Sequence, residues 1–240
     1  MHRWLSGLLT LLAPLLSATV SVGNSPGDDQ AQLAQVQQLV GHWRGVGQPK
    51  RGSTQDSWVA EADWVWSFAG GPALVGKLPQ GKFFRSVKLV PGEETGSYLL
   101  TATPVAEGPE MQFAGKLDEA QRLVLTALEP RAGMPERLSF RFVAGGNRLL
   151  LLLERKSATS DQYVRLAEVG YTRQGSGFGK GSSQPECVVT GGLGTIEALH
   201  AGQKYFVCCT GCLEYFKASP DEVIADYQAR QAAEKAESKP

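Results

Sequence analysis

The sequence predicts a mainly β protein, with an up-and-down antiparallel barrel of about ten strands followed by a small α+β domain. Three observations support this fold class. Short segments in which polar and apolar residues alternate fill the middle of the 240-residue chain. Turn-forming sequences rich in glycine, proline and aspartate separate these segments. All four cysteines lie together near the C-terminus.

Residues 1–23 have the pattern of a secretory signal peptide. His2 and Arg3 precede the apolar run Leu5–Leu16, and small residues follow it. The run is too short to span a bilayer with ease, although an uncleaved N-terminal anchor is the alternative. We therefore expect an exported protein, periplasmic or extracellular, with no membrane span after signal cleavage. Such a compartment is oxidising and favours disulfides.

A polar linker over 24–32 is expected to lead into a short amphipathic helix from Gln32 to Val40. Leu33, Val36 and Leu39 recur at helical spacing on one face. Acidic residues before this segment suit a helix N-terminus.

Period-two alternation begins at Gly41 and is clearest over 57–68, where the tryptophans share one face with small apolar residues. Closing such a long meander into a barrel removes its exposed edge strands. The expected strands are 41–48, 57–68, 72–78, 82–90, 97–103, 110–117, 121–128, 137–143, 147–154 and 161–173.

The tripeptide Gly41-His42-Trp43, directly after a helix, resembles the calycin barrels, which include lipocalins, fatty-acid-binding proteins and nitrobindin-like proteins. The resemblance covers about residues 33–173. It implies that Trp43 packs at the closed end of the barrel against Arg173 of the last strand. Nitrobindin-like barrels hold haem through a late histidine, and residues 137–173 contain none, so haem is disfavoured.

A barrel of this size can enclose an apolar small molecule. The alternative is that its aromatic residues simply fill the interior. His42 is expected to be a packing or surface residue.

A Gly/Ser-rich stretch over 174–184 reads as a flexible linker to a small domain over 185–230, and a polar flexible tail is expected over 231–240. A domain this small needs a cross-link such as a disulfide or a bound metal, because it buries little apolar area on folding. We expect a β-hairpin over 196–207 that turns at Ala201-Gly202, then helices over 213–216 and 221–229.

Cys187, Cys208 and Cys212 are the predicted metal ligands. Twenty residues separate the first two and three residues separate the last two. Cys208 is expected at a strand end and Cys212 at a helix start, where backbone amides favour thiolate. Three thiolates can converge on a soft or borderline ion such as Zn²⁺ or Cu⁺. Cys209 and His200 are the candidates for a fourth ligand, and Gly211 would allow the sharp turn that Cys209 needs.

The segments Cys187-Val188-Val189-Thr190-Gly191 and 204–212, together with Phe216 and Pro220-Asp221, resemble the TRASH/YHS family. The resemblance implies a treble-clef-like module associated with trafficking, resistance and sensing of heavy metals, copper included.

Other functions are less well supported by the sequence. The net charge is zero, so nothing points to a nucleic-acid partner. No nucleophile–base pair or catalytic carboxylate pair stands out, so we expect a protein that is not an enzyme. Cys209 and Cys212 have Cys-x-x-Cys spacing but no thioredoxin-like βαβ context. A disulfide-stapled interaction module, with Cys187 paired to Cys208 or Cys212, remains open, as does a carrier of an apolar molecule.

Overall fold

The computed structural model describes residues 26–174, 185–191 and 194–237. The predicted signal peptide over 1–23 lies outside the described residues, as do residues 175–184 of the predicted linker and the last three residues of the predicted tail. None of the helices described is both long and apolar enough to cross a lipid bilayer.

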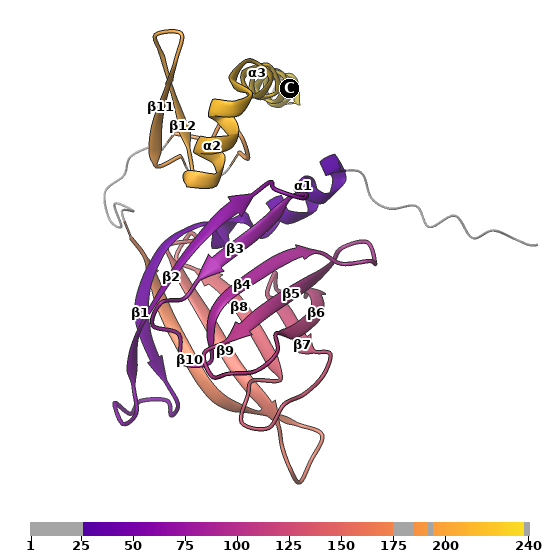
Figure 1. Ribbon diagram of the computed structural model, residues 1–240, viewed down its shortest axis with the longest axis vertical. Helices are drawn as coiled ribbons and strands as arrows, with labels where there is room; N and C mark the ends of the chain where they lie inside the picture. Colours follow the sequence, from indigo (N-terminus) through magenta and orange to yellow (C-terminus); the bar gives the residue numbers. More distant parts are fainter. Residues whose placement is uncertain (1–25, 175–184, 192–193, 238–240) are drawn as a thin grey trace, which may run out of the picture.

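The predicted ten-stranded antiparallel barrel is confirmed (Figure 1). Each strand pairs with its sequence neighbours, and β1 closes the barrel by pairing with both β2 and β10. The predicted ranges agree with the observed strands to within a few residues at each end. The strands are β1 Gly41–Gln48, β2 Trp58–Ser67, β3 Ala73–Lys77, β4 Phe84–Pro91, β5 Ser97–Pro104, β6 Met111–Leu117, β7 Leu123–Ala127, β8 Arg137–Val143, β9 Arg148–Lys156 and β10 Tyr163–Arg173.

The N-terminal helix differs from the prediction. Helix α1 spans Pro26–Ala34, and a separate 3-10 turn, η1, spans Gln37–Leu39. The expected linker over 24–32 was therefore wrong from Pro26 onward. Proline suits the first turn of a helix because it lacks an amide hydrogen, and Asp28 and Asp29 lie in the same turn, where they complement the helix dipole.

Contacts with the barrel hold this N-terminal segment over one barrel end. The buried Gln32 side chain donates to the Ser97 carbonyl, and the Tyr98 hydroxyl donates to the Gln32 carbonyl at 3.0 Å. The Trp43 indole donates to the Leu39 carbonyl at 2.7 Å. These contacts favour two short helical pieces over one continuous helix.

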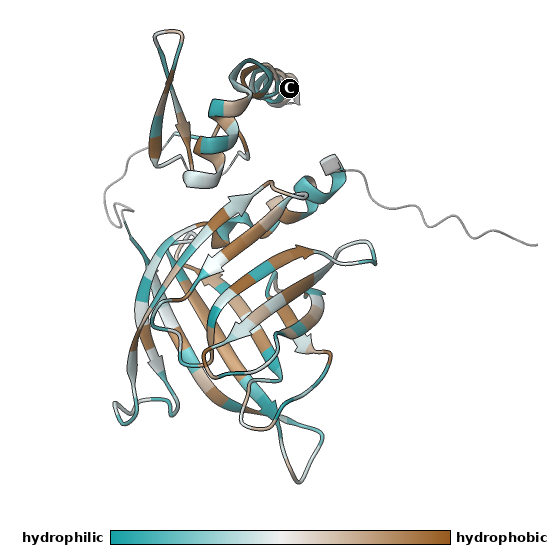
Figure 2. Cartoon of the chain, viewed as in Figure 1, coloured by the Kyte–Doolittle hydropathy of each residue, from teal (hydrophilic) through white to brown (hydrophobic). Residues whose placement is uncertain are grey.

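The barrel interior contains large side chains from the inward face of each strand. In β2, Ala60, Ala62, Trp64 and Trp66 are buried, and the residues between them are partly exposed. Trp64 meets Phe140 edge to face with ring centroids 6.4 Å apart. Figure 2 shows apolar and polar residues alternating along the strands. These side chains belong to the hydrophobic core of the barrel.

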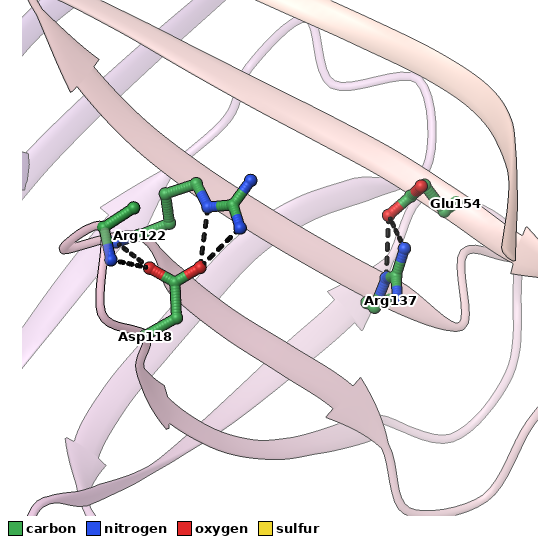
Figure 3. Close-up of polar contacts among 5 residues, drawn as sticks. Asp118, Arg122, Arg137 and Glu154 are labelled. Atoms are coloured by element: carbon green, nitrogen blue, oxygen red, sulfur yellow. Dashed lines mark hydrogen bonds and ion pairs between the residues drawn. The ribbon is translucent and has the colours of Figure 1, made fainter.

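Two ion pairs stabilise hairpins of the barrel, one within a turn and one between neighbouring strands (Figure 3). In the β6–β7 turn, Asp118 accepts from the Arg122 side chain at 2.6 Å, and backbone amides hydrogen-bonded to it, first that of Arg122, hold the pKa of Asp118 below its usual value. Arg137 of β8 donates to Glu154 of β9 through two nitrogens at 2.7 Å. Because Arg137 and Glu154 are register partners, this pair supports the strand alignment.

The C-terminal part consists of a hairpin and two helices. Its elements are β11 Ile196–His200, β12 Gln203–Val207, α2 Thr210–Ala218 and α3 Pro220–Glu237. The predicted tail from Gln231 was wrong as far as Glu237, because α3 continues through it. Arg230 donates to the Val188 carbonyl and Gln231 to Glu186, both at 2.8 Å, which anchors α3 beyond its predicted end. We call residues 185–237 the cysteine module.

The backbone conformation of the turn between β11 and β12 predicts that one substitution there stabilises the hairpin. Ala201 and Gly202 both have positive φ, at 49° and 78°. Such two-residue turns favour Asn-Gly, because asparagine tolerates the left-handed region better than alanine does. We expect Ala201→Asn to raise the opening free energy of the hairpin amides by about 0.5–1 kcal/mol in hydrogen exchange. Ala201→Val should lower it, and a lower value for the asparagine variant would contradict the turn assignment.

Candidate metal centre

Three cysteine sulfurs form a buried group in the cysteine module. The Sγ atoms of Cys187, Cys208 and Cys212 all lie within 4.8 Å of one another. Those of Cys208 and Cys212 are 3.5 Å apart. Cys187 and Cys212 are fully buried, and Cys208 is 8% exposed. All four cysteines are outside disulfide bonds in the structure.

Three local structures bring these sulfurs together. Cys187 precedes a turn in which the Gly191 amide donates to the Cys187 carbonyl at 2.9 Å. The Val188 amide donates to the Phe206 carbonyl, which attaches this turn to β12. Cys208 follows the end of β12, and Cys212 lies in the first turn of α2. A hairpin end and a helix start therefore face the turn after Cys187.

The thiols share protons through hydrogen bonds. Hydrogen bonds from Cys208 and Cys212, assisted by Thr190, lower the pKa of Cys187 to about 2 despite its burial. The same bonds raise the pKa of Cys208 and of Cys212 far above the usual thiol value. The sulfur group thus favours a thiolate that accepts hydrogen bonds from neighbouring thiols. A soft cation can replace the shared protons, because thiolate is the form that binds metal.

Cys209 is not one of the three grouped sulfurs. It stands at the N-cap of α2 in an extended conformation, and its Sγ accepts a hydrogen bond from the Trp66 backbone amide of β2 at 3.3 Å. Hydrogen bonds from Cys208 and Cys212, together with backbone amides, lower the pKa of Cys209 to about 3. Cys209 thus lies between the sulfur group and the barrel, a position that no signal in the sequence indicated.

The cysteine module docks on the exposed edge of β2 (Figure 1). Pairing between β1 and β2 stops at Gly41 and Trp64, so beyond Trp64 only β3 continues the pairing of β2. The start of α2 covers this edge: a Cβ added to Gly211 would lie 1.7 Å from the Trp66 carbonyl oxygen. Gly211 was expected to allow a sharp turn, but it lies inside α2, where it allows this close approach.

An aromatic contact extends the docking surface along β2. The rings of Phe68 and Tyr215 stack with centroids 4.4 Å apart. On the N-terminal side, Gln30 of α1 donates to the Val189 carbonyl at 3.4 Å. The module therefore contacts both the barrel and the helix that covers the barrel end.

His200 is not part of the sulfur group. Its Nε2 lies 3.0 Å from Asp221 Oδ1 at the start of α3, and its ring stands edge-on to Phe216. The structure thus places this predicted alternative ligand in a different contact.

Arg173 links the barrel end to the sulfur group. Its guanidinium carbon lies 4.2 Å from the Trp43 ring centroid, and its nitrogens donate to the carbonyls of Val40, Gln38 and Gly146 at 2.6, 2.5 and 3.2 Å. Burial lowers the pKa of Arg173 to about 10, and the charge of Cys208 acts in the opposite direction. The Arg173 cation and the Cys208 sulfur are therefore close enough to interact electrostatically.

Two clefts lie between the barrel and the cysteine module, and Arg173 and Cys208 line both. The first has a volume of about 520 Å³ and includes Glu186 and the loop at Gly146. The second has a volume of about 400 Å³ and includes His42, Asp63 and Cys209. Cys187 and Cys212 line neither, so Cys208 is the one of the three grouped cysteines that lines these clefts.

No protein-family model matches the chain, and neither does any curated protein. Among solved structures, the chain is similar to the crystal structure of Rv2717c from M. tuberculosis, with 18% sequence identity and a TM-score of 0.39. The similarity covers 60% of this chain and 97% of that one.

Proposed function

We propose that this chain is an exported, non-enzymatic protein that binds a heavy-metal ion for trafficking or sensing. A TRASH/YHS-like cysteine module would bind Cu⁺ or Zn²⁺, and a calycin-like barrel would carry the module. The observation on which the proposal rests is the buried group of three sulfurs, Cys187, Cys208 and Cys212. The signal-like segment over 1–23 supports export.

The donor set suits a soft ion. Three thiolates can bind Cu⁺ in a three-coordinate site, whereas Zn²⁺ prefers four ligands. Cys209 or a solvent molecule would supply the fourth. Backbone amides near Cys187 and Cys209 donate to sulfur, and Arg173 adds positive charge near Cys208, which offsets part of the negative charge of the thiolates.

Metal analysis of the mature chain tests this proposal. We expect the protein, purified under reducing conditions, to contain about one zinc or copper ion per chain by elemental mass spectrometry. X-ray absorption at the metal edge would then distinguish three sulfur ligands from four. Absence of a stoichiometric metal in the folded protein, also after incubation with Zn²⁺ or Cu⁺, would refute the proposal.

The 3.5 Å separation of the Cys208 and Cys212 sulfurs favours a second candidate, a disulfide-stapled interaction module. An oxidising compartment would support such a bond. Thiol titration of the denatured, unreduced protein separates the two functions. Four reactive thiols support the metal site, and two support a disulfide.

A further inference from the structure

A histidine and an aspartate of the barrel line the same cleft as Cys208. His42 of β1 and Asp63 of β2 are register partners on adjacent strands, and His42 Nδ1 lies 3.2 Å from Asp63 Oδ1. Both residues line the second cleft together with Cys208 and Cys209. One cleft is therefore lined by an imidazole–carboxylate pair of the barrel and by two cysteines of the module.

The orientation of this pair suits a metal ligand. The Asp63 carboxylate beside Nδ1 favours the imidazole tautomer with its hydrogen on Nδ1, which leaves the lone pair on Nε2 to bind a cation. The negative charge of the carboxylate also makes Nε2 a stronger electron-pair donor to a metal ion. The His42 side chain is 75% exposed, so ions in solution reach it directly.

The sulfur group is accessible only in part. Cys187 and Cys212 have no exposed surface, whereas Cys208 is slightly exposed and lines the cleft. Within the described part of the chain, an incoming ion would therefore meet Cys208 first among the three sulfurs. His42 stands on the barrel wall of the cleft that leads to Cys208.

We propose that His42, oriented by Asp63, is a capture ligand that binds the incoming ion and passes it through the cleft to Cys208. This inference rests on the proposed metal-binding function. The His42 Nε2 lone pair displaces a weakly held ligand such as water, and the Cys208 thiolate then displaces His42. Cys208 releases its proton to solvent, and the oxidation state of the ion does not change. The cargo is a free or weakly complexed Zn²⁺ or Cu⁺ ion.

The chain offers a matched control for this role. His200 also pairs with an aspartate, Asp221, at 3.0 Å, but it does so through Nε2. His200 lines neither of the two clefts beside Cys208. The two histidine–aspartate pairs therefore consist of the same residue types, but only the His42 pair lines a cleft beside Cys208.

Loading kinetics of the full chain test the capture role. Reduced, metal-free protein is mixed with weakly buffered Zn²⁺ in a stopped-flow instrument, and uptake is followed to completion. We expect His42→Ala to slow loading about tenfold, Asp63→Asn to slow it less, and His200→Ala to load at the wild-type rate. The final zinc content should be one per chain in all four proteins.

The outcomes separate this inference from the function on which it rests. Equal loading rates for wild type and His42→Ala would overturn the capture role and leave the sulfur site intact. A loss of final zinc content in His42→Ala would also overturn it, because His42 would then be a permanent ligand. Failure of every chain, wild type included, to take up metal would overturn the proposed function and the capture role together.

Discussion

Replacing Gly211 with alanine is expected to separate the cysteine module from the barrel. The new Cβ would lie 1.7 Å from the Trp66 carbonyl oxygen, far inside van der Waals contact. The clashing atom belongs to the backbone of a paired strand and cannot rotate away, so α2 must move off the edge of β2. The movement would break the hydrogen bond from the Trp66 amide to Cys209.

Hydrogen exchange at the Trp66 amide measures this separation. We expect Gly211→Ala to lower the opening free energy of that amide by about 1–3 kcal/mol, with little change at barrel amides on the far side. Phe68→Ala, which removes the stacking contact from the barrel side, should act in the same direction by about 0.5–1.5 kcal/mol.

The matched control lies beside Gly211. Thr210 is exposed and begins α2, so Thr210→Ala should leave the Trp66 amide protected. Full protection of this amide in Gly211→Ala would show that the module does not dock as the structure describes.

Replacing Cys187 with serine is expected to abolish tight metal binding and to loosen the cysteine module. Serine keeps the shape but removes one of three grouped sulfurs, and a neutral hydroxyl is a poor ligand for a soft ion. In a domain with a small core, metal-binding free energy is folding free energy. We expect metal affinity to fall by about 100-fold or more, which corresponds to about 2.8 kcal/mol.

Competition with a chromophoric chelator measures the affinity, and Cys209→Ser is the comparison. Because Cys209 lies outside the sulfur group, we expect its variant to retain affinity within about tenfold of wild type. Equal losses for the two variants would make Cys209 a ligand and would replace the three-sulfur site with a four-sulfur one. Barrel amides should stay protected in both variants.

The barrel could be predicted because its pattern is local. Side chains on a strand alternate between the two faces, so residues such as Ala62 and Trp64 in β2 reveal their environment through their neighbours alone. The positions at which the helices begin and end were harder to predict from the sequence. The start of α1 at Pro26 and the end of α3 at Glu237 depend partly on contacts with distant residues, such as that of Gln231 with Glu186.

The sequence by itself determined the number and order of the barrel strands and which three cysteines group together, since alternation and cysteine spacing are properties of short segments. Only the tertiary structure decided how the centre is enclosed. Trp66 and Cys209 are 143 positions apart, and His42 is further still from Cys208. Contacts between such distant segments arise when the module packs on the open edge of β2, and no local pattern records where that packing occurs.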